Sequence, residues 1–150
     1  MVVFALRHAD RTSGDDLSAI GRQRAKLLAR MLAESGVSIA YRSDAVRAAR
    51  TLEPLKQTLG AALTIEAVGF PGSGGIEFHI ATIVDKIKAL PANTVVAVVS
   101  HSNTVGPILE GLGSEPIGTI EEIQFDKLFV LFIGTESSPA LVMMRYGSAT

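Results

Sequence analysis

Residues 94–103 read TVVAVVSHSN, an unbroken apolar run that ends in a short polar segment. Valine dominates the run, and a short apolar segment rich in β-branched residues is typical of a strand buried on both faces of a parallel sheet. Residues 1–8, MVVFALRH, repeat the pattern, because an apolar run leads directly into Arg7 and His8. Both segments predict buried strands with reactive side chains at their carboxyl ends.

The segments around these two strands predict an alternation of strands and helices. Further strands are expected over residues 37–41, 63–68, 127–133 and 140–145, the last two forming a hairpin. Apolar residues at helical spacing predict helices over residues 17–32, 43–59, 76–90 and 104–112. Pro54 is expected to kink or divide the second helix. The pattern predicts an α/β fold in which residues 1–150 form a single three-layer α/β/α domain around a mostly parallel central sheet.

Composition excludes several classes of function. The chain has 150 residues, a formal net charge of −1 and no cysteine. It therefore has no disulfide, no thiolate metal site and no cysteine nucleophile, and its charge favours neither nucleic acid nor membrane as a partner. No segment resembles a signal peptide or a transmembrane span, so a cytoplasmic location is the expectation. The oligomeric state is left open.

Polar residues gather where the predicted parallel strands end. Ligands of such sheets bind beyond the carboxyl ends of the strands. The residues expected at this edge are Arg7, His8, Ser43, Arg47, His101 and Asn103. Arginine presents a planar fork that matches phosphate oxygens, and a histidine nitrogen can accept a phosphoryl group. This set of residues predicts phosphoryl transfer, for which an acid must also protonate the leaving group.

Four segments, in order, resemble the motifs of the histidine phosphatase superfamily, which includes phosphoglycerate mutases and small phosphohistidine phosphatases of the SixA type. They are Arg7-His8-Ala9, LSAIGRQRA at residues 17–25, SDAVRAART at residues 43–51 and SHSN at residues 100–103. The resemblance implies a phosphoglycerate mutase-like fold and a cofactor-independent phosphatase that needs no metal. It implies His8 as the phosphoryl acceptor, with Arg7, Arg47 and His101 binding the phosphoryl oxygens.

Two departures from the family pattern concern the chemistry. Ser100 stands where the family often has glycine, and the acidic residue that the mutase branch carries in mid-chain has no clear match. Asp10 is the preferred proton donor because it lies two residues past His8, and Glu77 is the alternative.

The substrate expected is a phosphomonoester, such as a phosphorylated small molecule, or a protein phosphohistidine. A phosphoglycerate mutase-like phosphotransferase and a non-catalytic phosphate-binding module are the alternatives. Ser43 and Asn103 could bind phosphate or serve as helix caps. His79 is interpreted as a surface residue, and Arg24 as part of a solvated helix face.

Overall fold

The computed structural model describes residues 1–70 and 74–150, and its centre is one six-stranded sheet with the order β3-β2-β4-β1-β5-β6. The strands are β1 (Val2–Arg7), β2 (Ile39–Ser43), β3 (Thr64–Val68), β4 (Val95–Ser100), β5 (Lys127–Phe132) and β6 (Ala140–Arg145). The pairs from β3 to β1 are parallel, whereas β5 is antiparallel to both β1 and β6. The predicted mostly parallel sheet and the C-terminal hairpin are confirmed. The composition of residues 69–75, GFPGSGG, predicts a flexible loop, and this stretch lies partly outside the described residues.

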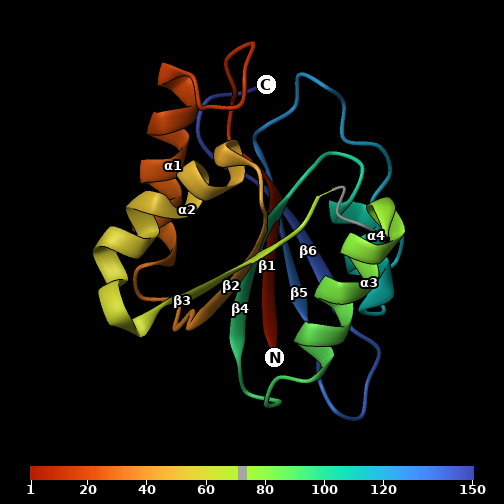
Figure 1. Ribbon diagram of the computed structural model, residues 1–150. Helices are drawn as coiled ribbons and strands as arrows, with labels where there is room; N and C mark the ends of the chain where they lie inside the picture. The colour runs from red at the N-terminus through yellow and green to blue at the C-terminus, as the bar shows by residue number, and fades with distance from the viewer. Residues whose placement is uncertain (71–73) are drawn as a thin grey trace.

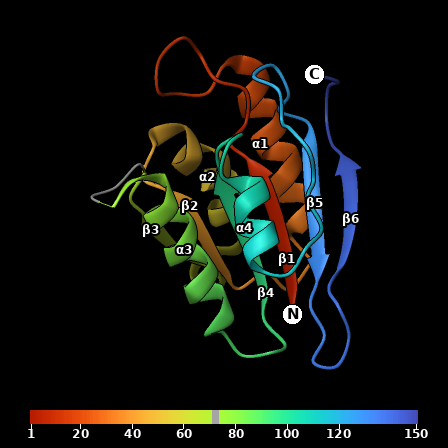
Figure 2. The same ribbon diagram turned by 90° about the vertical axis from the view of Figure 1, so that its right-hand side faces the viewer.

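Helices cover both faces of the sheet, as Figures 1 and 2 show. They are α1 (Ala19–Leu32), α2 (Val46–Leu59), α3 (Gly75–Lys88) and α4 (Val105–Gly111), with a short 3₁₀ turn over Gly60–Ala62. Helices α1 and α2 pack together on one face over a core that includes Leu28 and Leu52, and α3 and α4 cover the other face over Ile83 and Ile108. The three layers follow from these two cores. No helix in the described parts of the chain is both long and apolar enough to cross a membrane.

The order of the strands brings the reactive segments together. The chain steps from β1 across to β2 and β3, then returns to insert β4 between β1 and β2. Right-handed crossovers place the helices of the outward and return steps on opposite faces, and the point of reversal is where open α/β sheets bind ligands. Arg7 pairs with Ser100, and Arg42 pairs with Val99 in the same register. The residues that follow β1, β2 and β4 are therefore level with one another.

The start of α2 corrects one prediction. Ser43 is the last residue of β2 and not the cap of the helix, which begins at Val46. The cap comes from the loop before α1, where Asp15 accepts hydrogen bonds from the backbone nitrogens of Val46 and Arg47 at 3.1 and 3.2 Å. Helix α2 also continues through Pro54. The predicted division is wrong because the buried side chains on either side of Pro54 hold the helix as one element against the sheet.

Candidate active site

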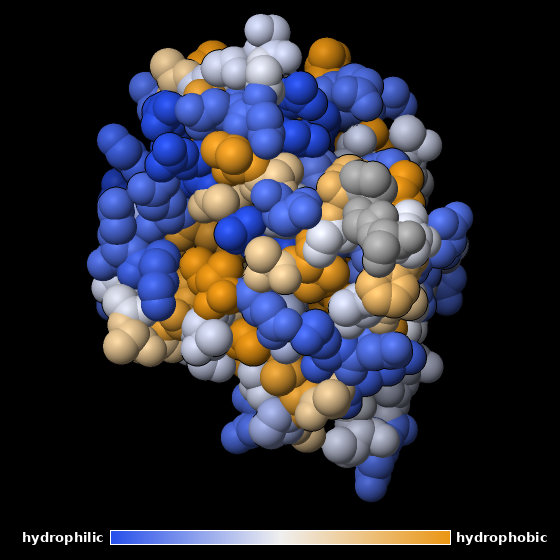
Figure 3. All heavy atoms as spheres, viewed as in Figure 1, coloured by the Kyte–Doolittle hydropathy of each residue, from blue (hydrophilic) through white to orange (hydrophobic). Residues whose placement is uncertain are grey.

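A pocket of about 250 Å³ lies at the carboxyl ends of β1 and β4. It is lined by Arg7, His8, Arg11, Arg47, Phe70, His101, Ser102, Asn103 and Glu122. Figure 3 shows hydrophilic residues gathered at the upper end of the molecule, above the carboxyl ends of the parallel strands. Among the predicted site residues, the pocket unites the two histidines, the two arginines and Asn103. Ser43 lies behind the pocket, and Asp10 lies outside its lining.

His8 has one ring nitrogen fixed by the backbone and the other directed at Arg47. Its Nδ1 lies 2.9 Å from the carbonyl oxygen of Ala9, to which it can only donate. Its Nε2 lies 3.1 Å from Nε of Arg47, from which it can only accept. The two contacts together define the Nδ1-protonated tautomer. They leave the lone pair of Nε2 facing the guanidinium of Arg47.

The segment after His8 is held by helices on one face of the sheet. The backbone nitrogen of Ala9 donates to Oγ1 of the buried Thr51 at 2.9 Å, and Thr51 in turn donates to the carbonyl oxygen of Arg47 at 2.8 Å. On the other side α1 approaches so closely that a Cβ on Gly21 would lie 2.0 Å from the carbonyl oxygen of Asp10. Gly21 is therefore required by this approach, which accounts for the glycine of the LSAIG segment.

Both pocket histidines are neutral near pH 7. Burial lowers the pKa of His8 to about 4, and the charges of Arg7 and Arg47 add to this effect against the opposing hydrogen bond to Ala9. Burial likewise lowers the pKa of His101 to about 3, with the proximity of His8 and Arg47 contributing. An unprotonated imidazole nitrogen is the form that can attack phosphorus. The electrostatics therefore keep the nucleophilic form of His8 available.

Arg47 connects the two histidines. Besides its contact with His8, its Nη2 lies 3.3 Å from Nδ1 of His101, and its Nη1 donates to Oδ1 of Asp15 at 2.8 Å. Partial burial alone would raise the pKa of Asp15, but hydrogen bonds from the backbone of Val46 and from Arg47 lower it to about 2. Asp15 is therefore a carboxylate that orients Arg47 while capping α2. Asp15 belongs to none of the sequence motifs, and no spacing indicates its role.

His101 is oriented by Ser43 and covered by Phe70. Its Nε2 lies 2.8 Å from Oγ of Ser43, a side chain with no exposed surface. The ring of Phe70 stacks on the imidazole with 3.9 Å between ring centroids and 20° between the planes. Because Nη2 of Arg47 can only donate to Nδ1 of His101, the proton of this neutral imidazole is on Nε2, which donates to Oγ of Ser43. Ser43 contacts the histidine, and it is not part of the pocket lining.

Arg7 is anchored to the loop before β5. Its Nη1 donates to the carbonyl oxygens of Glu121, Glu122 and Gln124 at 3.1, 2.8 and 3.1 Å. Its guanidinium stacks over the ring of Phe125, with Cζ 4.1 Å from the ring centroid. Arg7 is only 5% exposed, and its buried Nε has no hydrogen-bond partner among residues 1–70 and 74–150. An unpartnered buried donor beside a pocket favours binding of an anion there.

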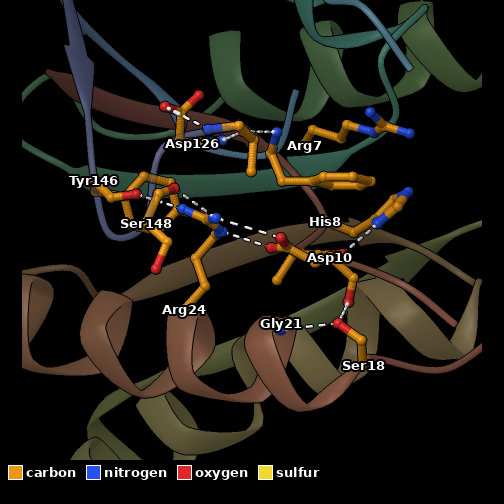
Figure 4. A network of polar contacts seen from close by, with 12 residues as sticks. Arg7, His8, Asp10, Ser18, Gly21, Arg24, Asp126, Tyr146 and Ser148 are labelled. Atoms are coloured by element: carbon orange, nitrogen blue, oxygen red, sulfur yellow. Dashed lines mark hydrogen bonds and ion pairs between the residues drawn. The ribbon is translucent and has the colours of Figure 1, made fainter. Parts of the chain in front are cut away.

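Asp10 is directed toward Arg24, as Figure 4 shows. Its Oδ2 accepts from Nε of Arg24 at 2.6 Å, and Arg24 also donates to the backbone carbonyl oxygens of Tyr146 and Ser148. Arg24 is 2% exposed, so its interpretation as part of a solvated helix face is wrong. It lies three residues after Gly21 and four before Leu28, on the buried stripe of α1. Arg24 thereby fixes the C-terminal segment against α1. The carboxylate of Asp10, which was expected to donate a proton, is engaged in the ion pair with Arg24.

His79 is a buried residue, and its interpretation as a surface residue is wrong. Its Nδ1 lies 2.9 Å from the carbonyl oxygen of Gly69, and its Nε2 lies 2.9 Å from Oγ of Ser100. Oγ of Ser100 lies 2.6 Å from Oγ1 of Thr104, which accepts from the backbone nitrogen of His101 at 2.9 Å. The hydroxyl that replaces the usual glycine is thus fully partnered. The position of His79 four residues before Ile83, on the buried stripe of α3, was a signal for this.

The remaining carboxylates divide between helix and loop. Glu77 lies in the first turn of α3, is exposed and does not line the pocket. Glu122 does line it, with Oε2 3.6 Å from Nη2 of Arg7. No motif or spacing in the sequence distinguishes Glu122 from its neighbour Glu121.

The fold and the pocket define an α/β protein in which two neutral histidines and two arginines meet at the edge of a mostly parallel sheet. Residues 6–68 match the family model of the histidine phosphatase superfamily (branch 1). No curated protein matches the sequence significantly. The sequence match covers residues 6–68, and the fold of the chain is that of solved histidine phosphatases.

Solved structures share the fold over nearly the whole chain. The protein histidine phosphatase SixA complexed with tungstate is similar with a TM-score of 0.67 and 22% identity, covering 97% of both chains. A mycobacterial glucosyl-3-phosphoglycerate phosphatase complexed with VO₃ has a TM-score of 0.65 and 15% identity over 99% of both chains. Phosphoserine phosphatase of Entamoeba histolytica in complex with 3-phosphoglyceric acid has a TM-score of 0.65 and 15% identity over 97% of both chains. These similarities place the fold among phosphatases that differ in substrate.

Proposed function

We propose that the protein is a phosphatase that hydrolyses a phosphomonoester or a protein phosphohistidine through a covalent phosphohistidine intermediate on His8. The single observation that carries the proposal is the orientation of the His8 ring. Its Nδ1 proton is held by the carbonyl oxygen of Ala9, so that the lone pair of Nε2 faces a pocket lined by Arg7, Arg47 and His101. A nucleophile is productive only when its lone pair faces the site of attack.

The first step transfers the phosphoryl group to His8. The Nε–H of Arg47, which donates to Nε2 of His8, turns to a phosphoryl oxygen as the substrate enters. Nε2 forms a bond to phosphorus while the bond from phosphorus to the leaving group breaks, and the leaving group takes a proton. The charge that spreads over the phosphoryl oxygens is stabilised by Arg7, Arg47 and His101.

The second step releases phosphate. Water forms a bond to phosphorus, the phosphorus–nitrogen bond breaks, and Nε2 recovers its lone pair. The low pKa of His8, about 4, means that the imidazole leaves unprotonated and is ready for another cycle. No cofactor or metal takes part in either step.

The substrate is proposed to present its phosphoryl group from an exposed position. The pocket volume, about 250 Å³, is below the range of about 300–1,000 Å³ typical of sites that enclose a whole small molecule. Asn103 and Arg11 lie at its rim and are available to the rest of the substrate. A phosphohistidine on a protein surface fits this geometry, as does a phosphomonoester that remains partly outside.

The proposal is tested by phosphate release from p-nitrophenyl phosphate and from a phosphohistidine-containing peptide. His8→Ala should abolish turnover on both while keeping the melting temperature near that of the wild type. Rapid acid-free quenching of the wild type should trap a phosphoryl adduct that peptide mapping assigns to His8. Turnover that survives in His8→Ala would refute the mechanism.

The assay also separates the two alternatives. Transfer of the phosphoryl group between hydroxyls of phosphoglycerate, without release to water, would identify a mutase-like phosphotransferase. Binding of vanadate or phosphate with no hydrolysis of any substrate would identify a non-catalytic binding module.

A further inference from the structure

The proposed reaction needs a proton donor that neither sequence candidate supplies. When the departing group is an alkoxide, its expulsion requires a positioned acid, which typically contributes about 10²–10⁴-fold to the rate. We propose that Glu122 donates this proton. The inference rests on the proposed phosphatase function and assigns a residue of the same pocket to the step that the function leaves open.

The other carboxylates near the pocket are engaged elsewhere. Asp10 is paired with the buried Arg24, and Asp15 has a pKa of about 2 that makes it a poor acid. Asp44 accepts a hydrogen bond from the backbone nitrogen of Phe70 at 3.0 Å. Glu77 lies in the first turn of α3 and does not line the pocket. Among residues 1–70 and 74–150, Glu122 is the only carboxylate that lines the pocket. The three remaining residues are proline, glycine and serine, so no further acid comes from them.

Glu122 combines a fixed backbone with a free side chain. The carbonyl oxygens of Glu121, Glu122 and Gln124 all accept from Nη1 of Arg7, which ties this stretch of loop to a phosphoryl-binding arginine. The carboxylate itself lies 3.6 Å from Nη2 of Arg7 and its side chain is 90% exposed. Glu122 therefore lines the pocket with a solvent-exposed carboxylate, and we place the leaving group on this exposed side. An exposed side chain of this kind can follow the leaving oxygen without disturbing Arg7.

The proposed step conserves atoms and charge. As Nε2 of His8 bonds to phosphorus, the phosphorus–oxygen bond breaks and the carboxyl proton of Glu122 passes to the departing oxygen. The resulting carboxylate then takes a proton from the water that attacks the phosphohistidine, which regenerates the acid. A single residue serves as acid and then as base, as microscopic reversibility requires of the two related half-reactions.

The test compares leaving groups in Glu122→Gln and wild type. Nitrophenolate departs without help, whereas an alkyl alkoxide does not. We expect the variant to lose on the order of 10²-fold in kcat on an alkyl phosphate, but less than about threefold on p-nitrophenyl phosphate. Its melting temperature should stay unchanged because the side chain is exposed. A role for Glu122 in folding or in substrate binding alone would not produce this selective loss.

Two further variants serve as controls. Glu115→Gln alters an exposed glutamate of the same loop that does not line the pocket, and it should leave both rates unchanged. Glu77→Gln tests the alternative acid on α3. Equal effects of Glu122→Gln on both substrates, or the selective loss appearing in Glu77→Gln instead, would overturn the assignment while leaving the phosphatase function intact. Absence of turnover in the wild type would overturn the proposed function itself.

Discussion

Asp10→Asn separates a structural carboxylate from a catalytic one. Asp10 lies two residues from the proposed nucleophile His8, yet its carboxylate pairs with Arg24, whose side chain is 1% exposed against 13% for Asp10. Asparagine keeps the shape and one acceptor oxygen but removes the charge. Arg24 would then be a buried cation with only the carbonyl oxygens of Tyr146 and Ser148 as full partners.

The expected cost follows from the burial of Arg24. Removing one partner of a buried ion pair costs about 3–5 kcal/mol, and the retained amide oxygen should reduce this to about 2–4 kcal/mol. For a domain of this size, each 1 kcal/mol corresponds to about 2–4 °C in melting temperature. We therefore expect Asp10→Asn to lower the melting temperature by about 4–16 °C. Urea unfolding measures the change in the free energy of unfolding, provided that the slope of this free energy against urea concentration is the same in the variant and the wild type.

Two further measurements decide whether this reasoning holds. Adding Arg24→Met to Asp10→Asn should recover part of the lost stability, since both charges of the pair are then absent. In the single variant, the rates on alkyl and nitrophenyl phosphates should change by the same factor. A selective loss on the alkyl phosphate, with stability unchanged, would show that Asp10 is the proton donor after all.

Other predictions concern the arginine, the histidines and their supports. Arg47→Lys should lower kcat/KM by about 10²–10³-fold because an ammonium cannot reproduce the guanidinium contacts, whereas Arg50→Lys on the exposed side of the same helix should not. The pKa of His8 is about 4 in the folded protein, against 6.5 for an exposed histidine as in the unfolded chain. The acid limb of kcat/KM should therefore have its midpoint near 4, and a limb near 6.5 would contradict the neutral, buried imidazole. The same difference means that stability contributed by neutral His8 is lost as the pH falls from 6.5 towards 4, measurable by urea unfolding. His79→Leu should cost about 1–3 kcal/mol by leaving the hydroxyl of Ser100 short of a partner, and adding Ser100→Ala should restore part of it. No recovery in that double variant would argue against the hydrogen bond as the cause.

The strands could be predicted from their apolar runs, and the pocket residues could be predicted from their positions at the carboxyl ends of those strands. The apolar runs before His8 and His101 identify the two central strands, and the rule on carboxyl ends then places both histidines and both arginines at one edge. Boundaries were less accurate. Strand β2 ends at Ser43, two residues later than predicted, because pairing with β3 and β4 extends it. Sequence patterns do not encode this tertiary pairing.

The supporting residues were missed for a different reason. Arg24 and His79 both lie on the apolar stripe of a helix. Charged and titratable residues are usually exposed, so both were expected to lie at the surface. Each is buried because a partner from a distant part of the chain satisfies it, Asp10 for Arg24 and Ser100 for His79. Long-range complementarity of this kind has no local signal. The position of each residue on the apolar stripe of its helix was the only indication in the sequence that the side chain is buried.

The loops carry two carboxylates that belong to none of the four sequence motifs. Asp15 and Glu122 come from two loops whose residues follow no period, and both act on the arginines that the motifs place in the pocket. Asp15 holds Arg47 at the N-terminus of α2, with a carboxylate that stays ionised to about pH 2. Glu122 contacts Arg7 weakly and is free to move. The difference in burial and bonding between the two carboxylates is what separates a residue that orients the site from one that can exchange a proton with the substrate.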